Sequence, residues 1–379
     1  MASASLPKGP IGNFNRNPGA WWRHLDLLLL GATGAVAGLG VLMVYSATRN
    51  QSGTAYLARQ GTFVVGGLVV LALVTFVDYR RLRDLAPVLY GGGLFLLLAV
   101  LTPAGTTVNG ARSWFALGSF QLQPAEFMKL ATVLLVAAVA SAAASHPLEG
   151  RTTFTCLVIG AIPIGLILLQ PDLGSALVFV AVVGAVVFVG GIHFRQLAVL
   201  ALIAAFGTIY LFGYSSILDN YQRDRLTTFV SADAENTASF QVRQAETAIG
   251  AGGVTGAGLF HGTQTKLQYV PYQKSDFIFT VVGEELGFAG SATLLILYGV
   301  IAWRIWRAAV VARDLFGTLV CVGVLAIFLF QLFENMGMAM GIMPVTGLPL
   351  PFLSYGGSST LTMFAAIGLV LNVHTRRFS

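Results

Sequence analysis

The chain has 379 residues, of which 56% are hydrophobic and only 10% are charged, whereas soluble globular proteins carry about 25% charged residues. This composition, with a mean hydropathy of +0.77, excludes a water-soluble enzyme and leaves room for about ten membrane spans of roughly 20 residues. The net charge of +6 does not indicate nucleic-acid binding, because the Lys and Arg residues lie in short clusters at the ends of apolar runs.

The chain begins with a polar tail at residues 1–22, which is followed by an apolar run at 25–46 that is too long for the core of a signal peptide. We expect this run to remain as a membrane anchor. Nine further runs predict an all-α polytopic membrane domain of ten transmembrane helices over residues 23–373, with a second tail at 374–379. These runs cover residues 60–77, 84–102, 123–143, 153–169, 173–192, 197–214, 277–303, 317–334 and 356–373.

An even number of spans places both termini on the same side of the membrane. The short loops on that side are richer in Lys and Arg than those on the other side, where most of the cations lie in one long loop. Because the charge bias of short loops sets orientation, both tails are predicted to be cytoplasmic.

Three long segments fall on the outer side, at residues 103–122, 215–276 and 335–358. The second is rich in Gly and has a helical pattern around residues 239–249, so we expect a large ordered extracytoplasmic loop between helices 7 and 8. The third is apolar, but its Pro and Gly residues forbid a continuous helix. Irregular backbone at membrane depth is tolerated only where protein buries it or where it lines a wet cavity.

Ionisable residues inside apolar runs are costly and therefore informative. Glu126 and Lys129 stand at positions i and i+3, a spacing that allows an ion pair on one helix face, with either a structural role or a role in substrate handling. Asp172 lies between two spans in a Gln-Pro-Asp-Leu-Gly sequence. Its carboxylate could bind a cation or an amide, or it could cap the following helix.

Asp276 follows Ser275 at the start of the eighth span, where the outer loop meets the membrane. On its chemistry alone it would be a first-turn acid, with Ser275 as the N-cap. Glu284 and Glu285 lie about two turns deeper and diverge around the helix, so they cannot both face lipid, and hydrogen bonding within the bundle is expected.

Cations on the outer side could gather around an anionic headgroup; they are Arg112, Arg223, Arg225, Arg243, Lys266 and Lys274. Neither Cys156 nor Cys321 indicates a disulfide or a metal site, because both lie inside apolar runs. The His residues lack metal-ligand spacing. At this point a transporter and an enzyme acting on a lipid substrate remain equally open.

Five motifs in order resemble the SEDS family (shape, elongation, division and sporulation proteins) over residues 23–373. They lie at residues 123–129, 170–174, 221–226, 276–287 and 349–359. Within the family, the Pro-Val-Thr-Gly-Leu-Pro-Leu-Pro stretch at 344–351 resembles the elongation branch, RodA, more than the division branch, FtsW.

The resemblance implies a peptidoglycan glycosyltransferase that polymerises lipid II, the undecaprenyl-pyrophosphate-linked disaccharide, at the outer face of the bacterial cytoplasmic membrane. It also implies a partner, a class B penicillin-binding protein. The family's essential Asp falls on Asp276. However, the family usually has Pro-Glu-x-His-Thr-Asp here, and residues 271–276 of this chain lack that Glu and His.

The implied reaction needs a general base on the acceptor hydroxyl, which the resemblance assigns to Asp276. The leaving pyrophosphate needs positive charge from Lys, Arg or a divalent cation such as Mg²⁺ or Mn²⁺. A lipid II flippase and a scaffold that activates a partner enzyme remain alternatives. Substrate binding is assigned to Arg112, Arg223, Arg225, Lys266, Lys274, Ser354 and Ser358, and intramembrane structural or functional roles to Glu126, Lys129, Asp172 and Glu285.

Overall fold

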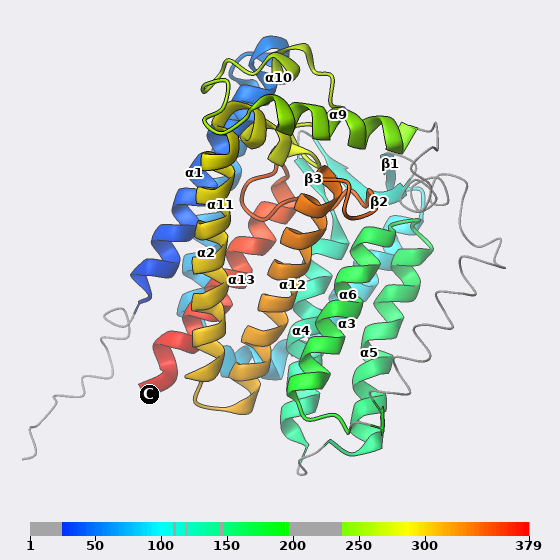
Figure 1. Cartoon of the computed structure of the whole chain (residues 1–379). Coiled ribbons are helices and arrows are strands. Elements are labelled where there is room, and N and C mark those ends of the chain that lie inside the picture. The colour runs from blue at the N-terminus through cyan, green and yellow to red at the C-terminus, as the bar shows by residue number, and fades with distance from the viewer. Residues whose placement is uncertain are drawn as a thin grey trace, which may run out of the picture.

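Nine apolar helices form an upright bundle in the part of the chain that the computed structural model describes, residues 25–108, 111–118, 120–143, 148–193, 195–196 and 237–378 (Figure 1). Eight of them, all except α6, are long and apolar enough to cross a membrane, which confirms a helical, multi-pass membrane fold. The predicted run at 197–214 lies outside the described residues, so the number of ten helices stays a prediction. The nine helices are α1 (Leu27–Ser52), α2 (Ala55–Phe76), α3 (Tyr79–Leu101), α4 (Pro124–Ala142), α5 (Gly150–Leu168), α6 (Leu173–Val189), α11 (Ile278–Val310), α12 (Leu315–Ala339) and α13 (Gly357–Thr375).

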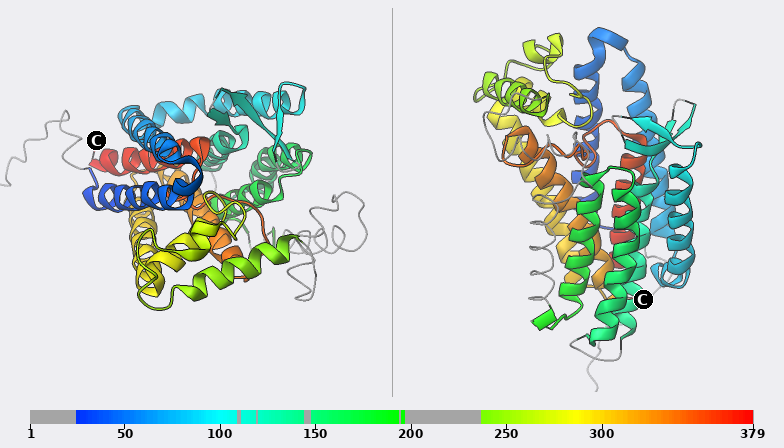
Figure 2. Two further views of the ribbon diagram at one scale, coloured as in Figure 1. Left: turned by 90° about the horizontal axis from the view of Figure 1, so that it is seen from above. Right: turned by 90° about the vertical axis from the view of Figure 1, so that its right-hand side faces the viewer.

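The helices divide into a buried centre and an apolar periphery. In their most apolar stretches α13 is 78% buried and α4 and α12 are each 61% buried, whereas α2, α3, α5 and α11 are at most 28% buried. The view along the bundle shows α13 enclosed by its neighbours (Figure 2). The exposed apolar faces of the peripheral helices are what a lipid environment requires.

Aspartates define where several helices begin. Asp26, Asp78, Asp172 and Asp314 are the N-caps of α1, α3, α6 and α12, and each carboxylate accepts a hydrogen bond from a backbone N–H in the first turn. Such caps satisfy donors that would otherwise be orphaned at a helix end.

Two structured segments cover one end of the bundle, which we call the loop end. One is a small antiparallel sheet of β1 (Thr106–Val108), β2 (Ala111–Leu117) and β3 (Phe120–Leu122), which the all-α prediction missed. Helix α9 (Thr237–Ala251) lies across the bundle and the short α10 (Thr263–Leu267) follows it (Figure 1). The helical pattern predicted around residues 239–249 is thereby confirmed.

Helix α11 is interrupted near the loop end, whereas a continuous helix was expected. Gly287 adopts φ 65° and ψ −162°, a conformation that favours glycine. The interruption frees the N–H groups of Phe288 and Ala289, which donate to the carbonyls of Gly253 and Val254 at 2.9 and 3.0 Å. The Gly-rich loop after α9 is therefore hydrogen-bonded to α11 at the interruption.

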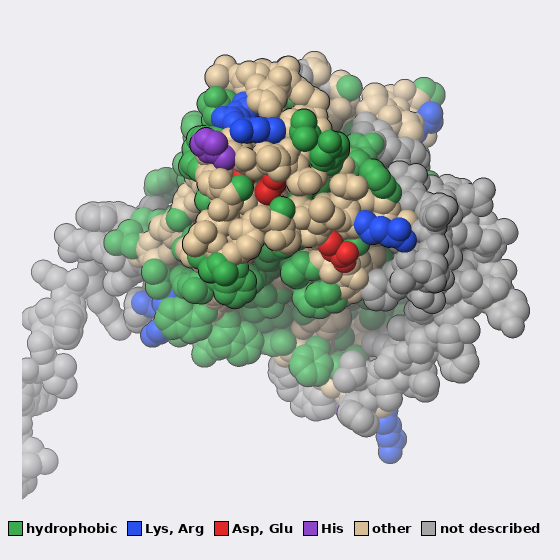
Figure 3. Space-filling model, turned by 45° about the horizontal axis from the view of Figure 1, so that its top comes forward, with side chains coloured by type: hydrophobic (Ala, Val, Ile, Leu, Met, Phe, Trp, Pro, Cys, Tyr) green, Lys and Arg blue, Asp and Glu red, His purple; other side chains and the backbone are tan. Residues whose placement is uncertain are grey.

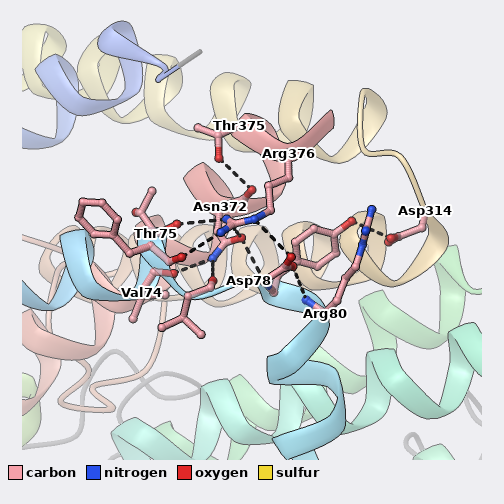
Figure 4. Close-up of polar contacts among 11 residues, drawn as sticks. Val74, Thr75, Asp78, Arg80, Asp314, Asn372, Thr375 and Arg376 are labelled. Carbon is pink, nitrogen blue, oxygen red and sulfur yellow. Dashed lines mark hydrogen bonds and ion pairs between the residues drawn. The ribbon is translucent and has the colours of Figure 1, made fainter. Parts of the chain in front are cut away.

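The opposite end holds the start of α1 and the end of α13, as the even number of spans predicted. There Asn372 of α13 donates to the Val74 carbonyl at 2.6 Å and accepts from the Tyr79 N–H at 3.2 Å (Figure 4). Arg376 adds a bond to the Thr75 carbonyl at 3.2 Å. These contacts join the last helix to the turn between α2 and α3.

Candidate functional site

Asp276 lies in a tight turn at the loop end, not in the first turn of α11. The N–H groups of Ser275, Asp276 and Phe277 all donate to the Tyr272 carbonyl, at 3.1, 3.1 and 3.4 Å. Helix α11 begins only at Ile278, and its N-cap makes no side-chain bond. The expected capping by Ser275 is therefore wrong, because the turn holds these residues outside the helix.

Three different donors hold consecutive carbonyls of this turn. The Tyr355 N–H bonds the Lys274 carbonyl at 2.9 Å, and the Ser354 hydroxyl bonds the Ser275 carbonyl at 2.5 Å. The Asn335 amide of α12 bonds the Asp276 carbonyl at 2.7 Å. The backbone beside Asp276 is thus fixed by α12 and by the segment that leads into α13.

Asn335 was not predicted, although it is fully buried and links two parts of this region. Its amide nitrogen donates to the Leu348 carbonyl as well as to the Asp276 carbonyl, each at 2.7 Å. One sequence signal could have identified Asn335: it follows Glu334 near the end of an apolar run.

A cluster of cations and tyrosines borders the turn. The Lys274 ammonium donates to the Tyr56 hydroxyl at 2.8 Å and lies 4.0 Å from the centre of the Tyr56 ring. The Arg59 guanidinium lies 5.8 Å from the same ring, and Tyr355 meets Tyr56 edge to face at 5.0 Å. We call Tyr56, Arg59, Lys274 and Tyr355 the cation–tyrosine cluster.

The cluster combines two positive charges with phenol groups. Burial raises the pKa of Tyr355 above its ordinary value, and the nearby Arg59 offsets part of that rise. Tyr355 is therefore neutral at physiological pH and can donate a hydrogen bond. Arg59 is exposed and Lys274 is partly exposed, so both charges are accessible to an anion.

The other predicted cations do not form one patch with Lys274 among the described residues. Arg112 lies on β2, Arg243 on α9 and Lys266 on α10, and all three are exposed. Lys and Arg side chains at the loop end occupy small separate groups (Figure 3). Arg223 and Arg225 lie outside the described residues.

Ser354 and Ser358 are buried and bonded to backbone, and their assignment to substrate binding stays a prediction. Ser354 also accepts from the Leu350 N–H at 2.8 Å. Ser358 donates to the Gln121 carbonyl at 2.8 Å and accepts from the Gln123 N–H at 3.0 Å. Both hydroxyls fasten the start of α13 to the loop end.

Glu126 and Lys129 form the predicted ion pair. The Lys129 ammonium lies 2.8 Å from the Glu126 carboxylate, and the two side chains are 0% and 1% exposed. Both residues lie in the first turns of α4, one of the buried central helices. The geometry thus confirms the pair.

Asp172 caps α6, one of its two expected roles. Its carboxylate accepts from the Ser175 N–H at 3.0 Å and the Ser175 hydroxyl at 2.7 Å. The Gln123 amide adds a third bond at 3.1 Å, which links the starts of α4 and α6.

Glu284 and Glu285 diverge, as predicted, and both anchor the outer loop. Glu284 accepts from the N–H groups of Gln264 and Thr265 at 2.7 and 2.8 Å, at the start of α10. Glu285 accepts from the Phe260 N–H at 3.0 Å and the Ser46 hydroxyl at 2.5 Å. Both residues are 1% exposed and are bonded to the outer loop, and a functional role for Glu285 stays a prediction.

No group of three or more His, Cys, Asp and Glu side chains suited to a metal ion occurs among the described residues. The turn carries one carboxylate, that of Asp276, two residues along the chain from Lys274. This set of groups can accept a proton and stabilise an anion.

Comparison with known proteins gives consistent matches over nearly the whole chain. Residues 23–378 match the family model for FtsW, RodA and SpoVE, described as cell cycle proteins. The stage V sporulation protein E of Bacillus subtilis is 36% identical, covering 92% of this chain and 96% of that protein. The peptidoglycan glycosyltransferase MrdB of Escherichia coli K12 is 35% identical, covering 96% and 97%.

A solved structure described as "Structural coordination of polymerization and crosslinking by a peptidoglycan synthase complex" has a similar fold. Its matching chain is 34% identical and superposes with a TM-score of 0.81, covering 94% of this chain and 99% of that chain.

Proposed function

Because this chain belongs to the FtsW/RodA/SpoVE family of cell cycle proteins, we propose that it is a peptidoglycan glycosyltransferase that polymerises lipid II. The observation that carries the proposal is the fixed turn at the loop end. It fixes the backbone of Lys274, Ser275 and Asp276 through bonds to their carbonyls, and the Lys274 side chain belongs to the cation–tyrosine cluster.

In the proposed reaction, the Asp276 carboxylate takes the proton of the acceptor sugar hydroxyl. The hydroxyl oxygen bonds to the anomeric carbon of the donor as the bond from that carbon to the pyrophosphate oxygen breaks. Configuration at the carbon inverts, and undecaprenyl pyrophosphate leaves with the electron pair. A fixed turn suits this role, because a base must be held within hydrogen-bonding reach of the proton it removes.

Lys274 and Arg59 are proposed to stabilise the charge that develops on the leaving pyrophosphate. Tyr56 supports the Lys274 ammonium with a hydroxyl at 2.8 Å, so the cation is oriented before the substrate binds. A divalent cation bound to the pyrophosphate is an alternative source of this charge. Arg223 and Arg225 remain proposed contributors.

The loop end is proposed to face outward from the cytoplasmic membrane, where a lipid-linked sugar would meet Asp276. The bias of Lys and Arg in the short loops supports this orientation. A class B penicillin-binding protein is the proposed partner, supported by the similarity to the chain of a peptidoglycan synthase complex.

An elongation role is proposed over a septal or sporulation role, on the basis of the Pro-rich stretch at residues 344–351. Depletion of the chain in a rod-shaped host should then produce round cells. Filaments of normal width would favour the septal role, and a defect confined to spores would favour the sporulation role.

The activity is tested by incubating the purified full chain with lipid II in the absence of any other glycosyltransferase, against a mock purification from cells that lack the chain. We expect glycan polymer, with faster synthesis when the partner is added. A flippase would instead move lipid II across vesicles without forming polymer. A scaffold would do neither by itself.

A further inference from the structure

Three helices bring a group of charges together at the end of the bundle opposite the loop end. Figures 1 and 2 show the start of α1, the end of α11 and the C-terminal segment close to one another there. The C-terminal segment is the short 3-10 helix Arg376–Phe378 that follows α13.

The group combines arginines with exposed tryptophan. The guanidinium carbons of Arg304 and Arg307 lie 5.2 and 5.8 Å from the centre of the same Trp303 ring. Trp303 and Trp306, one helical turn apart, are 49% and 53% exposed. Exposed Trp at the end of a membrane helix is typical of the interface between hydrocarbon and headgroups.

Three arginines lie near one buried carboxylate at this position. Asp26 is buried and is bound by Arg304 at 2.6 Å, and its other oxygen caps α1 by accepting from the Leu29 N–H at 3.0 Å. Burial lowers the pKa of Arg377, and the nearby positive charges of Arg304 and Arg307 lower it further. The Asp26 carboxylate opposes this lowering.

The carbonyl groups at the C-terminus of α11 supply further negative charge, but an exposed helix end is worth less than a full counter-ion. The guanidinium groups gather beside an exposed Trp surface, where the Asp26 carboxylate is already engaged by Arg304 and the Leu29 N–H. We propose that this site, formed by Arg304, Arg307 and Arg377 with Trp303, binds the phosphate headgroup of an anionic phospholipid from the leaflet at this end of the bundle.

A lipid fits this site better than a free phosphate does. The two Trp rings offer exposed apolar surface beside the guanidinium groups, which matches a ligand with both a phosphate and acyl chains. The alternative is that these arginines only reflect the general enrichment of Arg in short loops on one side of a membrane and bind no ligand. Arg81 and Arg83 serve as the control for that alternative, because they are exposed in the first turns of α3, whose start is bonded to the end of α13.

The test uses the delipidated full chain in detergent and counts bound lipids by native mass spectrometry, so it does not depend on catalysis. Dioleoylphosphatidylglycerol and dioleoylphosphatidylcholine provide the same acyl chains with anionic and zwitterionic headgroups. We expect Arg307→Gln/Arg377→Gln to weaken phosphatidylglycerol binding roughly 30-fold, and Arg81→Gln/Arg83→Gln to leave it unchanged. Arg304 is left intact because it holds Asp26.

Equal weakening by both double variants, or equal binding of the two lipids by the wild-type chain, would overturn the proposal. Inorganic phosphate at millimolar concentration should not displace phosphatidylglycerol; displacement that depends on Arg307 and Arg377 would identify a free-phosphate site instead. The single variant Arg307→Gln changes an exposed residue and should fold normally. It should weaken phosphatidylglycerol binding about fivefold, and wild-type binding by this variant would contradict the site.

Discussion

Replacing Glu126 by Gln should lower the free energy of unfolding by about 3 to 5 kcal/mol, because the change leaves the Lys129 ammonium charged and buried. The ion pair has an N···O distance of 2.8 Å, and neither side chain is more than 1% exposed. Water therefore cannot replace the lost partner. Lys129→Met should cause a loss of similar size, since it leaves the Glu126 carboxylate in the same environment.

The double variant Glu126→Gln/Lys129→Met removes both charges and should be more stable than the sum of the single effects predicts, by about 2 to 3 kcal/mol. The charge swap Glu126→Lys/Lys129→Glu should recover part of the lost stability. Unfolding in mixed detergent micelles measures each free energy, and Asp84→Asn, at an exposed position of α3, is the control expected to change little. Single variants as stable as the wild type, or strictly additive effects, would refute the reasoning.

Glu284→Gln should loosen the outer loop at a cost of about 1 to 3 kcal/mol, seen as faster tryptic cleavage after the exposed Lys266; unchanged cleavage would argue against the anchoring role. Asn335→Ala should slow polymerisation about tenfold or more while lipid II binding persists, because the Asp276 carbonyl loses its donor; wild-type turnover would show that the turn needs no such support. Lys274→Met should weaken lipid II binding by about tenfold, whereas the same change at Lys266 should not; equal effects would indicate general loop charge rather than a defined site.

The positions of the spans could be predicted from the sequence because bilayer thickness dictates the length of an apolar run. The ends of the helices could not, since α1 continues to Ser52 and α11 to Val310 through polar residues that interrupt the apolar run. The sheet at residues 106–122 was missed because its outer strands have only three residues each. The break at Gly287 depends on a loop that docks from about 30 residues earlier, which no local pattern reveals.

In the candidate site too, features set by local sequence could be predicted and features set by tertiary contacts could not. Asp276 was identified by its motif, and the ion pair of Glu126 and Lys129 by a spacing within one helix. Asn335 was missed because it reaches the turn from α12, and Arg59 was missed because it meets Tyr355 only in the folded chain. Ser354 was assigned to substrate, although its hydroxyl is consumed by backbone bonds that only the folded chain displays.

The most direct test of the account compares lipid II polymerisation by the purified wild-type chain and by Asp276→Asn. As a general base, Asp276 should contribute about a hundredfold or more to the rate, and its amide variant should keep normal expression, thermal stability and partner binding. Substantial glycan synthesis by pure Asp276→Asn protein, with no contaminating glycosyltransferase, would contradict the assignment and leave Asp276 as a structural residue of the turn.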